Sequence, residues 1–468
     1  MLSCVVCFLV IAPVLVLYST GDRFDFKKMK ITATGGIYVR SYPQAEQIVI
    51  DSKIKEKPGL FSNSIFVQSL LPNLHSVLVK KTGYYDYSKI IPVQEKEVTK
   101  LENILLIKKS IAFSEIGGQT DYFSVAPDNQ SIITAQYGSK SINFDYFSLT
   151  NINKQQTFSI SGKGKVLEMD WSEDSTKSLI KIQNANAVIY ELFNNAPLAQ
   201  ATPTSQTTTL VSASPTIAPK FSVTRLAYLD KNTQQILFNP QNSNQIFFVR
   251  NNSLYYSNVL ENTRIVATTA PAGQNPILLI KNLVAYQFSG NNIVWLSPDG
   301  TVSQSDISGK LIEQSAKNKI VTNTQFLFNK NTKNFENISL TGGNYQLLVS
   351  PDSKNLIYWN SNNIYISSSE NSQSQPNTKY QQLFSGANIN FCQWLNNSYI
   401  VFTAGDKIII SEIDYRGNIN SVTLPQTITI SSTDKIEVKN PQIFFNTQNS
   451  KLYILANNSL LSSEKLIP

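Results

Sequence analysis

Few residues in this 468-residue chain could perform chemistry, and they lie far apart in the sequence. The chain has a single histidine, His75, and three cysteines, Cys4, Cys7 and Cys392. A Ser-His-Asp triad, an HExxH zinc site or a centre with several histidine ligands would have to be built around that one imidazole. Three thiols cannot form a disulfide framework or a four-thiolate zinc site. We therefore predict no metal centre and no bound cofactor.

The densest acidic cluster consists of Glu168, Asp170, Glu173 and Asp174. Paired carboxylates can act as general acid and general base, so this cluster is the main candidate for catalysis. Its residues fall on alternating strand positions and in a turn, which favours the interpretation that they are solvated and structural. No Walker loop, GxSxG elbow, EF-hand loop or HExxH motif is present. The sequence therefore predicts that the protein is not an enzyme.

The composition indicates that several folded domains position these residues. Apolar residues make up 41% of the chain, aromatic residues 10% and charged residues 15%, which excludes a wholly disordered protein. A length of 468 residues exceeds one ordinary domain, so we expect two or more folded units.

The first 20 residues predict a membrane anchor. Residues 1–21 carry no charged side chain, and residues 2–18 are almost entirely apolar. Roughly 17–20 such residues in a helix span a hydrocarbon core of ~30 Å. A cleaved signal peptide is the alternative, but no Ala-x-Ala site follows the apolar run, which favours an uncleaved helix. We predict a single-pass transmembrane helix at 1–20 and a juxtamembrane linker at 21–33.

Basic residues gather next to the predicted anchor. Residues 1–110 hold 15 Lys/Arg and 9 Asp/Glu, which is a net charge of +6 out of +8 for the whole chain. We predict that Arg23, Lys27, Lys28 and Lys30 contact anionic lipid, each contributing about 1 kcal/mol, the alternative being an ordinary solvated face. Nucleic-acid binding is not expected, because the basic residues alternate with acidic ones. Taken alone, this basic flank would favour a cytoplasmic C-terminal side, but long domains translocate largely regardless of flanking charge, and we expect most of the chain to be extracytoplasmic.

Residues 34–109 predict a small antiparallel β-sandwich. Short β-branched segments at 35–39 and 48–51 are punctuated by proline and polar residues, which is typical of strands. Further strands are predicted at 65–70, 76–80, 89–93 and 101–107. Residues 71–75 predict a turn in which Asn73 suits a left-handed backbone, and residues 81–84 predict another.

This segment resembles the PEGA domain. The residues at matching positions are Ser41, Pro43, Asp51, Leu70, Pro72, His75, Val77, Gly83 and Tyr84. The sequence departs from the pattern where Ala45 and Glu46 replace Gly-Ala, Ser52 replaces the glycine after the aspartate, and Asn73 replaces the turn glycine. The resemblance implies an envelope or surface module without established catalysis. It also implies that His75 is a structural residue between a turn and a strand.

Residues 111–468 contain a degenerate repeat of an apolar strand, a polar turn and a second apolar strand. Seven copies can be recognised, beginning near Phe123, Met169, Ile236, Leu283, Leu347, Phe391 and Pro441. The turns are marked by Asp128, Asp174, Asn242, Asp352, Asn397 and Asn449. In that order, successive turns are 46, 68, 110, 45 and 52 residues apart. The 110-residue step contains the divergent fourth copy, and the 68-residue step contains a low-complexity segment at 195–220 that predicts an inserted flexible loop.

A period of about 40–55 residues with several strands is typical of β-propeller blades. Residues 125–129 and 350–353 resemble the Ser-Pro-Asp-Gly hairpin of WD-like and TolB-type propellers, whereas the literal string at 297–300 follows another strand and suits a different hairpin. The resemblance implies a propeller of about seven blades, with six or eight as alternatives. Four tryptophans lie in or beside these strands and are predicted to pack in the core: Trp171, Trp295, Trp359 and Trp394.

The sequence thus predicts an all-β protein, with a PEGA-like sandwich at 34–109 and a β-propeller at 111–468, preceded by one transmembrane helix. The combination is similar to PEGA-containing membrane proteins of bacteria. We expect a non-enzymatic binding or scaffold protein of the envelope, whose propeller presents a ligand face to a protein or glycan. The alternative is a propeller hydrolase or lyase acting on cell-wall polysaccharide, which needs carboxylates or a Ser-Lys pair converging at the propeller mouth.

Overall fold

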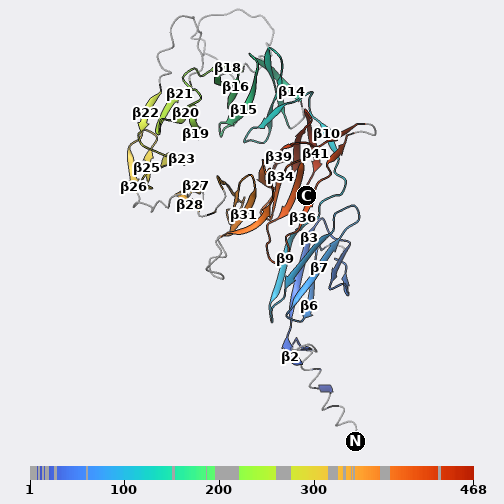
Figure 1. The fold of residues 1–468 in the computed structure, drawn as a ribbon. Coiled ribbons are helices and arrows are strands. Elements are labelled where there is room, and N and C mark those ends of the chain that lie inside the picture. Colours follow the sequence, from blue (N-terminus) through green and yellow to red (C-terminus); the bar gives the residue numbers. More distant parts are fainter. Residues whose placement is uncertain are drawn as a thin grey trace, which may run out of the picture. The chain divides into compact units, whose positions relative to one another are not determined.

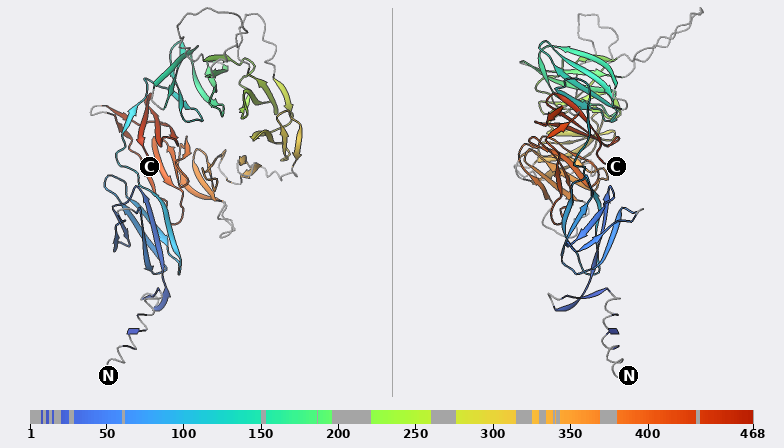
Figure 2. Two further views of the ribbon diagram at one scale, coloured as in Figure 1. Left: turned by 180° about the vertical axis from the view of Figure 1, so that it is seen from behind. Right: turned by 90° about the vertical axis from the view of Figure 1, so that its right-hand side faces the viewer.

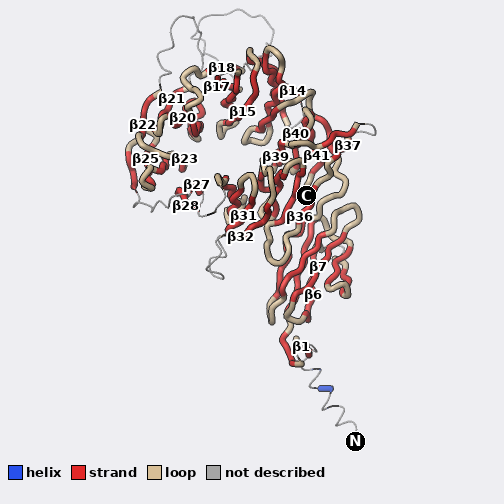
Figure 3. Tube along the Cα trace, viewed as in Figure 1, coloured by secondary structure: helices blue, strands red, loops and turns tan. Residues whose placement is uncertain are grey.

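The computed structural model describes residues 8, 11–12, 15, 21–25, 29–59, 62–149, 153–185, 187–195, 221–259, 276–314, 325–329, 334–338, 340, 343–368, 380–430 and 434–467. Every element of three residues or more in these segments is a β-strand (red in Figure 3), so the predicted all-β class is confirmed. Within the same segments, no helix combines the length and the apolar character needed to cross a bilayer. The predicted transmembrane helix at 1–20, apart from four residues, and the predicted loop at 195–220, apart from Asn195, lie outside the described residues.

The chain divides into two compact units. Residues 1–115 and 348–468 form the first unit, and residues 116–347 form the second. In Figure 1 the first unit therefore carries the blue and the orange-to-red ends of the colour scale, and the second carries the colours between them.

The predicted sandwich is present in the first unit (blue in Figure 2) and consists of two sheets, with strand orders β6-β3-β9 and β5-β4-β7-β8. The strands are β3 (Gly35–Tyr42), β4 (Gln47–Ile50), β5 (Ile54–Glu56), β6 (Ser64–Leu70), β7 (Leu74–Lys80), β8 (Tyr87–Pro92) and β9 (Val98–Leu105). The expectation of a purely antiparallel sandwich is wrong at one pair, because β9 runs parallel to β3. The chain makes β8 in one sheet and then crosses to the free edge of β3 in the other.

Alternation of side chains explains why these residues form a sandwich. In β7 the inward positions are His75, Val77 and Val79, and the residues between them are exposed or half-buried. Val77 and Val79 pack in one cluster with Ile37 and Val39 of the facing sheet, which are fully buried. Burying each such aliphatic side chain stabilises the fold by about 1.5–3 kcal/mol.

Both ring nitrogens of His75 are engaged inside the sandwich. Nδ1 lies 2.6 Å from Asp51 Oδ2, and Nε2 lies 2.7 Å from the carbonyl oxygen of Leu71. The other oxygen of the Asp51 carboxylate accepts a hydrogen bond from Ser76 N at 3.0 Å. These contacts agree with the structural role expected for His75. The prediction of a left-handed Asn73 is wrong: Ser69 has the positive φ (64°), and Asn73 Oδ1 instead accepts a hydrogen bond from Leu74 N.

The second unit contains four consecutive four-stranded sheets and one two-stranded sheet. The four-stranded sheets are β11 (Tyr122–Val125), β12 (Ser131–Tyr137), β13 (Ser141–Ser148) and β14 (Asn153–Ser161); β15 (Gly164–Trp171), β16 (Lys177–Asn184), β17 (Ala187–Asn194) and β18 (Ser222–Arg225); β19 (Gln234–Asn239), β20 (Asn242–Arg250), β21 (Ser253–Asn258) and β22 (Ile277–Ile280); and β23 (Ala285–Ser289), β24 (Asn292–Leu296), β25 (Val302–Asp306) and β26 (Leu311–Gln314). The two-stranded sheet is β27 (Gln325–Asn329) and β28 (Asn334–Ile338).

Three more four-stranded sheets follow, one of which starts at the unit boundary. They are β29 (Gln346–Val349), β30 (Asn355–Trp359), β31 (Asn363–Ser368) and β32 (Gln381–Ser385); β33 (Cys392–Trp394), β34 (Tyr399–Ala404), β35 (Lys407–Glu412) and β36 (Ser421–Thr423); and β39 (Gln442–Asn446), β40 (Lys451–Ala456) and β41 (Ser459–Lys465) with β10 (Phe113–Glu115) at its edge. A separate hairpin joins β37 (Thr427–Thr429) and β38 (Lys435–Glu437). The last sheet thus takes strands from both ends of the repeated region.

Each of the seven predicted repeats supplies the first two strands of a four-stranded sheet. Successive four-stranded meanders are the repeating unit of β-propellers, so the predicted propeller-like fold is confirmed at the level of its repeating sheets. The 110-residue step holds the predicted fourth copy and also the unpredicted sheet β27–β28. The number of blades stays a prediction.

The Ser-Pro-Asp-Gly-like turns are structural, as expected. The fourth turn residue has a positive φ in four hairpins: Asn129 (56°), Ser175 (58°), Gly300 (82°) and Ser353 (61°). The aspartate before it caps the turn, as where Asp352 Oδ1 accepts hydrogen bonds from Ser350 Oγ (2.6 Å) and Lys354 N (3.2 Å). The turn ending at Gly300 joins β24 to β25, the second hairpin of its sheet, whereas the others join first and second strands.

Apolar layers fill the spaces between neighbouring sheets. One face of the β15–β18 sheet carries Met169 and Ile180 toward β11–β14, and the opposite face carries Leu179 and Tyr190 toward β19–β22. The predicted core position of the tryptophans is confirmed for Trp295, Trp359 and Trp394, which are buried. Trp171 is half-buried, and its Nε1 donates a hydrogen bond to Ser124 Oγ.

Within the first unit, a buried polar junction joins the sandwich to the β33–β36 sheet. Lys89 of β8 is fully buried, and its Nζ lies 2.6 Å from Glu412 Oε1. The same ammonium donates to the carbonyl oxygens of Asp414 and Asn418. Tyr87 OH donates to the second oxygen of Glu412 at 2.8 Å. The junction satisfies each of these buried charges with a partner, which a buried ion needs in order to be tolerated.

Candidate functional site

The second unit contains a cavity of about 370 Å³ to which successive sheets contribute their first strands. Residues of β15, β19, β23 and β27 line it, together with side chains from β16, β17 and β28. Acidic, basic and aromatic residues meet there. Cavities of this size, lined by apolar and aromatic groups with a few placed polar groups, are typical of ligand sites.

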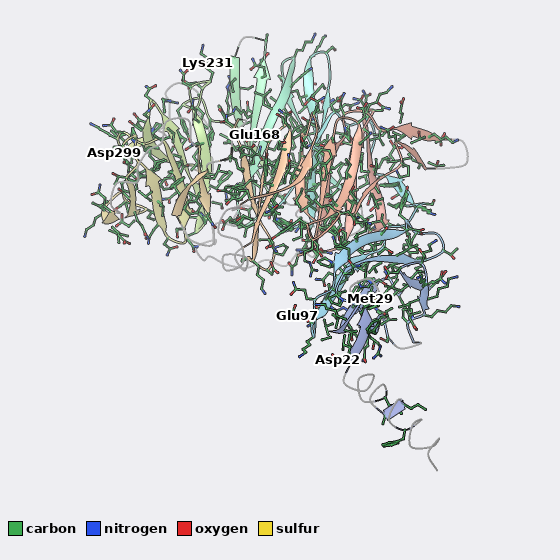
Figure 4. All side chains as sticks on the ribbon, turned by 60° about the horizontal axis from the view of Figure 1, so that its bottom comes forward. Asp22, Met29, Glu97, Glu168, Lys231 and Asp299 are labelled. Carbon is green, nitrogen blue, oxygen red and sulfur yellow. The ribbon has the colours of Figure 1, made fainter. Side chains whose placement is uncertain are left out.

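Two of the four predicted acidic residues face this cavity. Glu168 (labelled in Figure 4) and Asp170 are two positions apart on β15, so their side chains leave the same face of the strand. Lys181 stands opposite Glu168 in the β15–β16 register, and its Nζ lies 3.8 Å from Glu168 Oε2. Glu168 therefore has a basic partner at the wall of the cavity.

Asp170 is the unusual member of the pair. It is half-buried, and its carboxylate has no hydrogen bond or ion pair with any described residue. Burial and the negative charge of Glu168 raise the pKa of Asp170 to about 7, although Lys181 acts in the opposite direction. Asp170 lines the cavity and has no donor among the described residues, and its expected solvated, structural role stays a prediction.

The hydroxyl group of Tyr190 adds a second unsatisfied polar group. Tyr190 lies opposite Lys181 on β17, is 1% exposed, and its OH has no hydrogen-bond partner among the described residues. Burial, then the charges of Glu168, Asp230 and Asp170, raise the pKa of this phenol to about 12. Lys181 Nζ lies 5.9 Å from the centre of the ring. The hydroxyl therefore stays protonated and can both donate and accept a hydrogen bond.

Aromatic and apolar groups complete the wall. The single hydroxyl donor of Tyr286 on β23 lies within hydrogen-bond distance of two carbonyl oxygens, those of Gln235 (2.9 Å) and Phe247 (2.7 Å), which fixes its ring. Phe328 and Phe335 come from β27 and β28, with ring centres 5.3 Å apart. The sequence pattern does not predict Phe328 and Phe335 as cavity residues, because the segment of β27 and β28 carries no Asp-rich turn of the repeated type.

Glu173 and Asp174, the other members of the acidic cluster, lie in the β15–β16 turn and do not line the cavity. Asp174 Oδ1 accepts hydrogen bonds from Ser172 Oγ (2.6 Å) and Thr176 Oγ1 (2.7 Å). Burial acts to raise the pKa of Asp174, but these hydrogen bonds lower it to about 2. For Asp174 the structural interpretation is supported.

A larger hollow, of about 940 Å³, lies in the first unit beside the buried junction. Its charged groups already have partners: Glu412 binds Lys89, and the Asp414 carboxylate lies 2.8 Å from Arg416 Nη2. The cavity at Asp170 is the stronger candidate because two of its polar groups, the Asp170 carboxylate and the Tyr190 hydroxyl, have no partner in the described part of the chain.

No group of three or more His, Cys, Asp or Glu residues in the described segments is arranged to hold a metal ion. Cys392 is a free, buried thiol whose pKa is raised by burial. Cys4 and Cys7 lie outside the described residues.

Two of the four predicted membrane-contact residues, Arg23 and Lys30, lie in paired strands where a linker was expected. β1 (Asp22–Asp25) pairs with β2 (Lys30–Ala33), and Arg23 Nη2 donates a hydrogen bond to Ser69 Oγ at 2.9 Å. Lys30 is exposed, and Lys27 and Lys28 lie outside the described residues. Three exposed apolar side chains accompany them: Phe24, Met29 and Ile31.

No protein-family model matches the sequence, and no curated protein matches it. Among solved structures, a chain of a mitotic checkpoint complex is similar with 9% identity and a TM-score of 0.37, covering 77% of this chain and 93% of that chain. Raptor from Chaetomium thermophilum is similar with 10% identity and a TM-score of 0.39, covering 76% of this chain and 29% of that chain.

Proposed function

We propose that the protein is a non-enzymatic binding or scaffold protein that holds a protein or glycan ligand at the Asp170 cavity. The observation that carries the proposal is a half-buried carboxylate and a buried phenol hydroxyl at one aromatic cavity, neither of which has a partner among the described residues. Unsatisfied buried polar groups cost free energy, and a ligand that supplies their hydrogen bonds recovers it.

We further propose that the protein is a single-pass membrane protein of the cell envelope with most of its chain extracytoplasmic. The uncharged apolar residues 2–18 support this placement. In the β1–β2 hairpin, Phe24 and Ile31 are exposed cross-strand partners, next to the basic Arg23 and Lys30. Apolar and basic groups together are typical of a surface that lies against anionic lipid. A PEGA-like identity of the sandwich is part of this proposal.

Binding is tested with full-length protein in detergent micelles, incubated separately with defined envelope glycans and with envelope proteins. We expect a saturable ligand that is retained by the wild type and lost in the double variant Asp170→Leu/Tyr190→Phe. Glu313→Gln, an exposed carboxylate of the same unit, is the matched control and should bind like the wild type. Equal retention by the double variant and the wild type would contradict a ligand site at this cavity.

The pKa of Asp170 supports a second function, that of a propeller hydrolase or lyase acting on cell-wall polysaccharide. A carboxylic acid with a pKa of about 7 can donate a proton to a leaving group near neutral pH. Incubation with purified wall polysaccharide should then release new reducing or unsaturated ends, with activity lost in Asp170→Asn. Binding without product formation favours the scaffold function.

A further inference from the structure

We propose that the Asp170 cavity recognises an alkylammonium group, from a small amine or from a lysine side chain of a protein. The inference rests on the proposed binding function and specifies the chemistry of its ligand. It follows from the charge balance, the unsatisfied acceptors and the shape of the cavity.

The charge balance leaves one carboxylate available. Lys181 Nζ lies 3.8 Å from Glu168 Oε2, so these two charges largely offset each other. Asp170 has no such partner among the described residues. The cavity is therefore short of one positive charge, and an anionic ligand would meet both carboxylates.

The Tyr190 hydroxyl is an independent sign of a missing ligand. It is buried, lines the cavity and has no partner in the described part of the chain. An ammonium group has three donors, which suit the acceptor oxygens of Asp170, Glu168 and Tyr190. The ring of Tyr190 already lies 5.9 Å from one ammonium, that of Lys181, so its surroundings tolerate a cation.

The remaining wall suits an alkyl chain. Leu237, Tyr286, Phe328 and Phe335 give the cavity apolar surface beside its polar groups. A volume of about 370 Å³ accommodates one side chain or a small amine. An alkyl stem with a charged head therefore matches the cavity in both size and polarity.

The groups around Asp170 determine how binding depends on pH. Glu168 lies on the same strand as Asp170, β15, and Lys181 lies on the adjacent strand β16. The other titratable groups are Tyr190 on β17, Tyr286 on β23, Tyr122 on β11 and Asp230 before β19. Burial and the charges of Glu168 and Asp170 raise the pKa of Tyr122 to about 12, and burial raises that of Tyr286, so the phenols keep their protons. Asp170 is the group that titrates near neutral pH, and it must lose its proton to bind a cation.

The experiment is isothermal titration calorimetry of the full-length protein with n-butylamine, which is protonated below about pH 10. We expect binding at pH 8 that weakens by up to about tenfold per pH unit below pH 7, because Asp170 must release a proton. Asp170→Asn should weaken binding at least tenfold. Lys181→Met should strengthen it, because it removes a competing cation and frees Glu168.

n-Butanol is the neutral control ligand. If butanol or a neutral sugar binds as well as butylamine, or if Lys181→Met weakens binding, the cation inference is overturned while the binding function stands. If no ligand of any class binds, both fail. Peptides carrying one lysine identify the source of the ammonium group, with an acetyl-lysine peptide as the uncharged control. Tighter binding of the lysine peptide than of butylamine assigns a protein partner, and equal binding assigns a free amine. Each of these two results supports an ammonium site.

Discussion

At the scale of single residues, Asp170 is half-buried and has no partner among the residues that the structure describes. Asp174, four positions away, has several donors, and the pKa values of the two carboxyl groups move in opposite directions, to about 7 and about 2. The sequence places both in one acidic run, and only the fold separates them. Asp174 lies in a turn whose side chains donate hydrogen bonds to it, whereas Asp170 faces a cavity in which no described residue does so.

Asp170 should cost stability at neutral and higher pH. Its folded pKa of about 7 lies above the ordinary value, so its contribution to stability is complete below about pH 4 and is lost as the pH rises through 7. We predict that Asp170→Asn raises the free energy of unfolding at pH 8 by about 1–3 kcal/mol and changes it little at pH 4. Urea unfolding at both pH values measures this. The control Glu313→Gln should show no such difference, and a destabilised Asp170→Asn at pH 8 would contradict the assignment.

His75 makes the opposite kind of contribution, because both of its ring nitrogens have partners. We predict that His75→Ala lowers the free energy of unfolding by about 1–3 kcal/mol, since it leaves the half-buried acceptors of Leu71 and Asp51 without their partner. Leu74→Ala, at the exposed neighbouring position, is the control and should have a small effect. Chemical denaturation compares the two, and equal stabilities would mean that His75 has no structural role.

At the scale of elements, turn chemistry explains which strands could be predicted. Some hairpins have an aspartate cap and a left-handed fourth residue, such as those ending at Asn129 and Ser353. These hairpins can be predicted from the sequence, because each turn residue is favoured by its local backbone conformation. Strands β27 and β28 lack this signature and were missed. The prediction of a left-handed backbone at Asn73 is wrong for a local reason as well. The Asn73 side chain accepts a hydrogen bond from Leu74 N, and the positive φ falls on Ser69.

Gly417 lies in the loop between β35 and β36, close to the backbone of β8 in the sandwich. Its φ is 72°, and a Cβ atom there would lie 1.8 Å from the carbonyl oxygen of Ile90. We predict that Gly417→Ala destabilises the first unit by about 3 kcal/mol or more, because the backbone at β8 must move.

Gly405 is the matched control for this prediction. It also has a positive φ, 58°, but a Cβ atom there meets nothing within 4 Å. Gly405→Ala should therefore cost only about 1 kcal/mol, the conformational penalty of a left-handed alanine. Thermal unfolding of the two variants separates the cost of the steric clash at Gly417 from the cost of a left-handed alanine. Equal losses of stability in the two variants would show that the junction is loosely packed.

At the scale of the whole molecule, the sequence predicts modules better than sites. The strands of the sandwich and the first hairpin of each of the seven repeats can be predicted, because alternating apolar residues and turn residues act over only a few sequence positions. The cavity requires side chains from Glu168 to Phe335, gathered by packing of successive sheets, and no local pattern encodes that convergence. The division into units is equally non-local, because residues 1–115 belong with 348–468.

Membrane attachment is a whole-molecule prediction. We expect full-length protein to sediment with membranes and to resist extraction by high salt and alkaline carbonate, because residues 2–18 are apolar and uncharged. Removal of residues 1–20 should release it, apart from a salt-sensitive fraction held by the β1–β2 hairpin. Phe24→Ser/Ile31→Ser in the shortened chain should abolish that fraction. Full-length protein in the soluble fraction would contradict the anchor.

The most direct test of the central claim, a ligand site at Asp170, is NMR titration of its side-chain carboxyl carbon with and without n-butylamine. The structure predicts a midpoint near pH 7 in the free protein, where burial and Glu168 oppose ionisation. Bound cation should move the midpoint down by at least one pH unit. A midpoint near 4, unchanged by ligand, would show an ordinary solvated carboxylate and would contradict the account.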